Sequence, residues 1–248
     1  MKIHTFEIRK QIDNAEVILY PTLLEIKDKY FLVDCGYEET FPEFITGLRT
    51  MGVDLEDLHA ILISHDDIDH IGALKLFKDK NPDLIIYSSE IEEPSISGRI
   101  KSERLEQAEQ SLLTLPQEYI TWAHHFIHQL KSIKRIQVDA ILKDNDKIEG
   151  QVQVVFTPGH TKGHISFYIP GEKTVIANDA LVIEGEKFDI ANPMFTLDMP
   201  QAIRSVELIK EMQPEIVICY HGGIAKGNIS QKLTELIDKY KQQKQTLL

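Results

Sequence analysis

The stretch ILISHDDIDHIGAL, residues 61–74, passes from an apolar run of strand length through a polar turn into a helix-like pattern. Within six positions of that turn lie His65, Asp67, Asp69 and His70. In an extended turn, residues two apart face the same side, so His65 and Asp67 can share one metal ion. Asp69 and His70, at the start of the helix, can turn toward a second ion. The segment therefore predicts a cluster of metal ligands between a strand and a helix.

Three further segments have the same layout, in which an apolar strand is followed by a loop containing Pro, Gly or Asn. VQVVFTPGHTKGHISFYI begins at residue 152 and offers His160 and His164, KTVIANDALV begins at 173 and offers Asp179, and EIVICYHGG begins at 215 and offers His221. A rigid sheet commonly presents functional groups on loops at one edge, because the strands fix where each loop begins. We therefore expect these side chains to converge on the turn at residues 65–70.

The order and context of these segments resemble the metallo-β-lactamase superfamily. Its members carry an HxHxDH motif, then a histidine in a TPGHTxGH-like loop, then a bridging aspartate and a final histidine. The resemblance runs from about Asp34 to Gly222, and the TPGHTKGH string at residues 157–164 is a highly specific match. It implies an α/β fold of the αβ/βα four-layer sandwich type and a hydrolase with a dinuclear metal site.

The resemblance also implies a role for each matching residue. His65 and His160 would bind the first ion, and the second ion would be held by Asp69, His70 and His221. Asp179 would bridge the two ions. Two further residues would support the ligands by hydrogen bonding without binding metal themselves. These are His164 and Asp34, the latter in the sequence LVDCG at residues 32–36.

Asp67 is the position at which this chain departs from the family motif, because an aspartate replaces the second histidine and gives HxDxDH. A carboxylate can also bind zinc, so we keep Asp67 as a metal ligand, with a hydrogen-bonding neighbour as the alternative. Three aspartates beside two divalent ions leave a formal charge of +1 (−3 + 4), against +2 with histidine at this position. We therefore expect lower Lewis acidity, and Mn²⁺ or Fe²⁺ stay open beside Zn²⁺.

Asp69 and Asp179 are the residues that we expect to act in catalysis. Two ions bridged by Asp179 would share a water and lower its pKa toward neutrality, and the resulting metal-bridging hydroxide would be the nucleophile. Asp69 could orient that hydroxide or carry a proton to the leaving group. The predicted function is hydrolysis of a small ester, lactone or thioester. Two alternatives stay open: a mononuclear iron sulfur dioxygenase-like oxidoreductase, and a phosphodiesterase or nuclease.

Composition and charge limit the partners of the protein. Lys and Arg total 27 against 39 Asp and Glu, and the formal charge of −12 would repel a phosphate backbone, so we expect no nucleic acid partner. Residues 1–248, without linker or repeat, are expected to form a single domain. We find no stretch as long as a membrane span and no export signal in MKIHTFEIRKQID, which predicts a cytoplasmic protein without a membrane partner.

The middle of the chain, at about residues 98–135, differs from the rest because it lacks a convincing strand and carries a helical apolar stripe. We interpret it as a helical insertion that either covers the site as a lid or packs on the sandwich. Its histidines His124, His125 and His128 are not accompanied by the Glu of an HExxH site. We therefore expect these three histidines to face solvent at least in part.

Strand-length apolar runs predict the other elements of the fold. These runs lie at residues 16–20, 30–33, 61–63, 84–87, 152–156, 165–169, 174–177 and 216–219. Helices are expected after His70, after Pro200, and over residues 229–240 with Asn228 as N-cap. Cys35 and Cys219 lie in apolar runs and are expected to be reduced and structural. Tyr220 either stabilises an oxyanion or belongs to the core.

Overall fold

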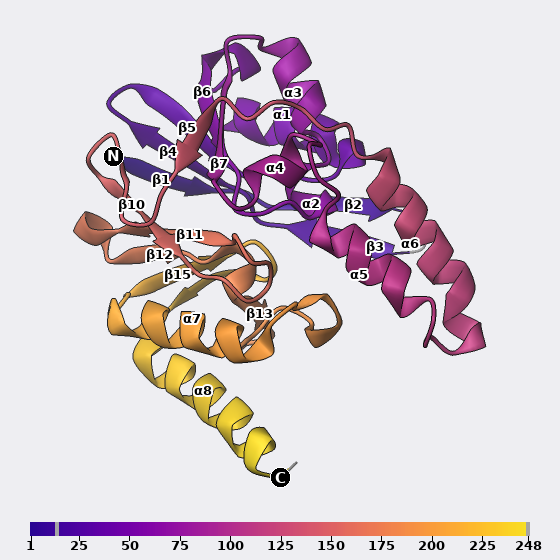
Figure 1. Cartoon of the computed structure of the whole chain (residues 1–248). Helices are drawn as coiled ribbons and strands as arrows, with labels where there is room; N and C mark the ends of the chain where they lie inside the picture. The colour runs from indigo at the N-terminus through magenta and orange to yellow at the C-terminus, as the bar shows by residue number, and fades with distance from the viewer. Residues whose placement is uncertain (13–14, 247–248) are drawn as a thin grey trace.

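Two six-stranded sheets form the centre of the computed structural model, which describes residues 1–12 and 15–246 (Figure 1). The first sheet has the order β1 (Lys2–Thr5), β4 (Thr22–Ile26), β5 (Lys29–Val33), β6 (Leu58–Leu62), β7 (Ile85–Ser89) and β8 (Ala140–Leu142). The second has the order β16 (Gly223–Lys226), β15 (Ile216–Cys219), β12 (Thr174–Ile176), β11 (Ile165–Ile169), β10 (Val152–Phe156) and β9 (Lys147–Ile148). Two hairpins accompany them, β2 (Ile8–Ile12) with β3 (Ala15–Leu19) and β13 (Val182–Glu184) with β14 (Lys187–Asp189).

The sheets face each other, and helices cover their outer faces (Figure 1). Alternate residues of a strand point to opposite faces, and β5 follows this rule. Phe31 and Val33 pack between the two sheets, whereas Leu32 packs outward with α1 (Phe41–Thr50) and α3 (Leu74–Lys80). On the second sheet, α7 (Met199–Glu211) and α8 (Ile229–Thr246) cover the outer face. The predicted αβ/βα four-layer sandwich is confirmed.

Strand direction brings the ligand-bearing loops together. Strands β5 to β8 are parallel neighbours in the first sheet, and β12 is parallel to β15 in the second. Parallel neighbours place their carboxyl ends at the same edge of a sheet, where ligands usually bind in such folds. His65 comes after the carboxyl end of β6, Asp179 after that of β12, and His221 after that of β15.

The segment at residues 98–135 is helical, as predicted, with α5 (Glu103–Ser111) and α6 (Ile120–Ser132). The two helices pack on each other through Ala108, Ile127 and Leu130. The Ser102 hydroxyl accepts a hydrogen bond from the Leu105 amide and caps α5. Two short helices, α2 (Ile68–Ile71) and α4 (Glu93–Ile96), complete the α-helices, and 3₁₀ turns lie at Glu38–Thr40, Leu55–Asp57, Gln117–Tyr119, Pro170–Glu172, Asn178–Ala180 and Pro193–Phe195.

All eight predicted apolar runs overlap strands, and the predicted helices after His70, after Pro200 and over residues 229–240 are present. The last of these continues to Thr246. The strands that the sequence did not predict are β1, β2, β4, β8, β9, β13, β14 and β16; most of them are short or lie at sheet edges, where the pattern is too brief to stand out. In the described part of the chain, no helix combines the length and apolarity that crossing a membrane requires.

The cysteines and the histidines of the insertion also lie where they were expected. Cys35 and Cys219 are free and buried, and burial raises the pKa of both thiols, as suits structural residues. His124, His125 and His128 are exposed on α6.

Candidate metal site

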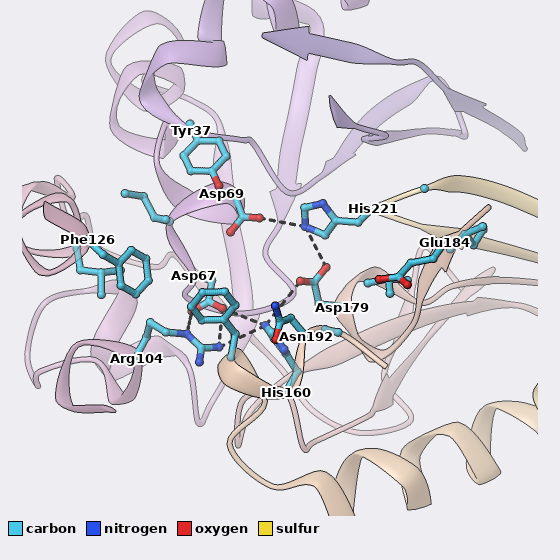
Figure 2. A pocket seen from close by; sticks show the side chains of 17 residues that line it. Tyr37, Asp67, Asp69, Arg104, Phe126, His160, Asp179, Glu184, Asn192 and His221 are labelled. Carbon is cyan, nitrogen blue, oxygen red and sulfur yellow. Dashed lines mark hydrogen bonds and ion pairs between the residues drawn. The ribbon is translucent and has the colours of Figure 1, made fainter. Parts of the chain in front are cut away.

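The predicted ligands converge in the structure, on loops that follow strands and in the first turn of α2. Figure 2 shows Asp67, Asp69, His160, Asp179 and His221 pointing toward one another. Asp67, the residue before α2, has an extended backbone with φ −70° and ψ 151°. The chain therefore runs extended from β6 and turns helical immediately afterwards. Asp69 and His70, in the first turn of α2, form a group with His221, and the His70 ring also lies beside that of His65, with ring centroids 4.0 Å apart.

The side chains form overlapping groups at one edge of the sandwich. The first group contains His65, Asp67 and His160, and the second contains Asp69, His70 and His221. A further group, His65, His70 and Asp179, joins the two. Asp179 lies between them, with Oδ2 3.6 Å from Nε2 of His160 and Oδ1 3.5 Å from Nε2 of His70.

The spacing of the donor atoms suits ions of the size of zinc. A tetrahedral ion with bonds of about 2.1 Å holds its ligand atoms about 3.4 Å apart. In the first group, Oδ2 of Asp67 lies 3.5 Å from Nε2 of His65 and 3.0 Å from Nε2 of His160. In the second, Oδ2 of Asp69 lies 3.0 Å from Nε2 of His221 and 3.6 Å from Nε2 of His70.

Buried polar atoms without a hydrogen-bond partner give a second test of the fit. Such atoms are costly in a native protein and usually mark a site for water, an ion or a ligand. Nε2 of His65, Nε2 of His70 and Oδ1 of Asp179 are all buried without a hydrogen-bond partner. All three atoms belong to candidate metal ligands, and a bound ion would give each of them a partner. The donor set of this chain therefore fits divalent metal ions.

Asp34 supports His70, as predicted. Its side chain is fully buried, and Oδ2 lies 2.8 Å from Nδ1 of His70. The other oxygen accepts a hydrogen bond from the Ser64 amide at 2.8 Å, and the Ser64 hydroxyl donates to Oδ2 at 2.7 Å. A carboxylate at Nδ1 keeps the proton on that nitrogen and leaves the lone pair of Nε2 free for a metal.

His164 supports the bridging aspartate in a different way. Its Nε2 accepts a hydrogen bond from the backbone N–H of Asp179 at 3.2 Å, and its Nδ1 lies 2.9 Å from the Thr157 hydroxyl. Burial, followed by the neighbouring His65, holds the pKa of His164 well below its ordinary value. A neutral imidazole can accept this bond, so His164 fixes the loop of Asp179, as predicted, and belongs to neither group of candidate ligands.

Asp67 has a partner that the sequence did not reveal. Nε of Arg104, on α5, donates to Oδ1 of Asp67 at 2.8 Å, and Nη2 donates to Oδ2 at 2.7 Å (Figure 2). Burial opposes the charge of Asp67, but Arg104 and His160 outweigh it and hold the pKa of this carboxyl well below its ordinary value. Arg104 adds one positive charge to the earlier count, so with two divalent ions bound the site would total +2 (−3 + 1 + 4).

Glu92 connects two of the ligand loops through hydrogen bonds. The sequence did not predict this role. Its Oε1 accepts hydrogen bonds from the Thr161 hydroxyl at 2.7 Å and from the Gly163 amide at 2.8 Å, and its Oε2 accepts one from the Asp66 amide at 3.2 Å. These bonds connect the turn at residues 65–70 to the loop of His160. Burial, together with the charge of Asp66, raises the pKa of Glu92 well above its ordinary value.

A cavity of about 370 Å³ opens onto both groups. Tyr37 lies in its wall, where the charge of Asp69 and burial raise the pKa of the phenol, so the hydroxyl stays protonated at neutral pH. Tyr220, by contrast, is buried and donates to the backbone oxygen of Asp69 at 3.0 Å. Of the two interpretations of Tyr220, membership of the core is therefore the one that holds. The insertion contributes Arg104 and Phe126 to the cavity wall.

The four-layer fold and the paired His and Asp groups define a protein of the metallo-β-lactamase type. The chain belongs to the Metallo-beta-lactamase superfamily, which matches residues 20–221. The probable metallo-hydrolase YflN of Bacillus subtilis (strain 168) is 24% identical over 241 residues, covering 92% of this chain and 88% of that protein. An N-acyl homoserine lactonase of Bacillus cereus is 27% identical over 216 residues, covering 77% and 74%.

Among solved structures, a metallo-beta-lactamase family protein of Thermus thermophilus has the same fold, with a TM-score of 0.75. Its sequence is 22% identical, and the match covers 99% of this chain and 81% of that one. Membership of the superfamily implies divalent metal binding and supports a hydrolase.

Sequence reasoning could have found Arg104 only indirectly. A buried carboxylate needs a cation or several hydrogen-bond donors, so replacement of a ligand histidine by Asp67 calls for a compensating charge. The sequence offers many cations that could supply it, and nothing local selects Arg104. Tyr37 follows Gly36 in the strand-end loop, a position that suggests proximity to the site without showing that the ring faces the cavity.

Proposed function

We propose that this chain is a metal-dependent hydrolase that cleaves a small ester, lactone or thioester at a site for two divalent ions, most simply zinc. The observation that carries the proposal is the position of Asp179. One of its oxygens lies 3.6 Å from Nε2 of His160, and the other lies 3.5 Å from Nε2 of His70 and 3.6 Å from Nε2 of His221. A carboxylate with one oxygen toward each group suits a residue that bridges two ions.

The ions, when bound, supply hydroxide at neutral pH and polarise the carbonyl of the substrate. The side chains around them provide the remaining chemistry. Asp69 lines the cavity beside His221, and we assign it the transfer of a proton to the leaving group. Tyr37, which stays protonated, can donate a hydrogen bond to the oxyanion that develops on the substrate.

The cavity supports a substrate that is small and largely apolar. Its volume of about 370 Å³ lies at the lower end of the range for small-molecule sites. Much of its wall is apolar and comes from Ile68, Phe126, Leu130, Val182, Ile183 and Phe195. The guanidinium of Arg104 lies in the cavity wall, but it already binds both oxygens of Asp67 and is not available to an anionic group of a substrate. The net charge of −12 also disfavours a polyanion.

Metal analysis and an activity screen test this proposal together. Protein purified without added metal is analysed for zinc, manganese and iron, and is then assayed with lactones, carboxylic esters, thioesters and phosphodiesters. We expect up to two zinc or manganese ions per chain and turnover of a carboxylic substrate. Asp179→Ala should abolish turnover while the protein stays folded, and Asp238→Ala, on the exposed face of α8, should leave turnover unchanged. Near-normal activity of Asp179→Ala would end the bridged-ion proposal.

A second candidate is a mononuclear iron oxidoreductase of the sulfur dioxygenase type. The observation in its favour is that His65, His160 and Asp179, two imidazoles and a carboxylate, lie together in the site. A single iron per chain, with thiol-dependent oxygen uptake and no hydrolysis in the screen, would favour this function over the hydrolase.

A further inference from the structure

Arg104 is the one cation among the described residues that forms an ion pair with a candidate metal ligand. Its side chain is 2% exposed, and its guanidinium binds both oxygens of Asp67, the geometry of a two-pronged arginine–carboxylate pair. In the second group, the ion pairs of Asp69 among the described residues are with His70 and His221. The first group therefore differs from the second in that an arginine already neutralises its carboxylate.

The guanidinium also occupies space close to the first group. Its Nη2 lies 3.4 Å from Nε2 of His160, the atom that would bind a metal there. A divalent ion bound by His160 and Asp67 would therefore lie beside a fixed positive charge. It would also have to share a carboxylate whose two oxygens already accept charged hydrogen bonds. Both effects lower the affinity of this position for a cation.

Several contacts hold Arg104 in this place. Nη1 donates to Oε1 of Gln107, one turn further along α5, at 2.6 Å. The guanidinium carbon lies 5.5 Å from the centre of the Phe195 ring, within the range of a cation–π contact. Nε2 of Gln107 in turn donates to the backbone oxygen of Met194 at 3.2 Å. A metal ion cannot displace the guanidinium without breaking contacts that also hold α5 against the segment at 193–195.

We propose that Arg104 makes the two metal positions unequal. The position formed by Asp69, His70 and His221 fills first and tightly, and the position formed by His65, Asp67 and His160 fills second and weakly. The helical insertion thus sets how easily the second ion is bound, through one side chain. This inference rests on the proposed function, in that it takes the site to bind divalent metal.

A titration with Zn²⁺ against a competing chelator tests the inference without an activity assay. The metal-free wild-type chain should bind two ions in succession, with affinities that differ by about 10-fold or more. His221→Ala should lose the tighter binding and keep the weaker, which assigns the two steps to the two positions.

Arg104→Met removes the charge and keeps most of the side-chain length. We expect its weaker affinity to rise by about 10-fold, toward the tighter one, because Asp67 becomes an uncompensated carboxylate facing the metal. Arg99→Met is the matched control. Arg99 pairs with Glu93, which belongs to none of the groups of candidate ligands, so both affinities should equal those of the wild type.

Each result decides between the inference and its alternatives. Equal affinities in the wild type, or a weaker affinity that falls or stays unchanged in Arg104→Met, would overturn the inference and leave the proposed hydrolase standing. Absence of any bound zinc, manganese or iron would instead remove the proposed function. If Arg104→Met does not fold, the wild-type and His221→Ala titrations still test the inference, because equal affinities, or loss of the weaker binding in His221→Ala, would overturn it.

Discussion

Replacement of Asp34 by asparagine should disable the metal position of His70 without altering the shape of the site. Asp34 has φ +58°, a left-handed backbone conformation that asparagine adopts readily, so the substitution introduces little backbone strain. The amide oxygen can still accept the hydrogen bond from the Ser64 amide, which lies 2.8 Å from Oδ1. What is lost is the charged acceptor 2.8 Å from Nδ1 of His70.

The reason for the effect is the position of one proton. The side-chain nitrogen of the introduced asparagine would donate to Nδ1 of His70, and the imidazole proton would then move to Nε2, the atom required by the metal. Loss of a buried, charge-assisted hydrogen bond lowers the free energy of unfolding of the metal-free protein by about 2 kcal/mol. Disturbing such a support of a ligand lowers metal affinity by about 10- to 100-fold, or about 1.4 to 2.8 kcal/mol.

The assay combines zinc titration against a chelator with urea unfolding of the metal-free protein. Asp139→Asn is the matched control, since Oδ2 of Asp139 also accepts a backbone bond, from Ile86 at 2.8 Å, and belongs to none of the metal groups. We expect Asp139→Asn to bind zinc like the wild type. An Asp34→Asn protein with wild-type zinc affinity would refute the reasoning that Asp34 fixes the tautomer of His70.

Three further outcomes are expected. Gly159→Ala should lower the free energy of unfolding measured in urea by about 3 kcal/mol. Gly159 has φ +136°, and an added Cβ would lie 2.2 Å from the backbone N of Ala202, so an unchanged free energy of unfolding would contradict this. Burial raises the pKa of Asp189, but the hydrogen bonds from Lys239 and Tyr240 outweigh it and hold the pKa below its ordinary value. The ionised carboxylate therefore stabilises the fold above about pH 4, and this contribution is lost as the pH falls through the native pKa. Asp189→Asn should therefore cost about 1 kcal/mol at pH 6 and progressively less as the pH falls below about 4, and a cost that does not change with pH would argue against it. Removal of metal by a chelator should lower the melting temperature, and added zinc should restore it. The reason is that a ligand at about 100 times its Kd stabilises the folded state by about 2.7 kcal/mol. A melting temperature that the chelator does not change would count against a metal site.

The sequence by itself identified the His and Asp side chains that gather in the candidate site and the strands that carry them. Apolar runs of three to five residues followed by polar loops are local signals, and they identified the strands before His65, His160, Asp179 and His221. The helical character of residues 98–135 was also readable, because an amphipathic stripe depends only on neighbours along the chain.

Only the tertiary structure decided which residues complete that site. Arg104 and Asp67 are 37 residues apart, and Glu92 and Gly163 are 71 apart, so no local pattern relates them. A helical pattern shows that one face of α5 is buried, but it does not show which carboxylate a side chain on that face will meet. Coulombic and hydrogen-bond energies depend on distances of a few ångströms, and those distances are fixed by the packing of the insertion against the two sheets.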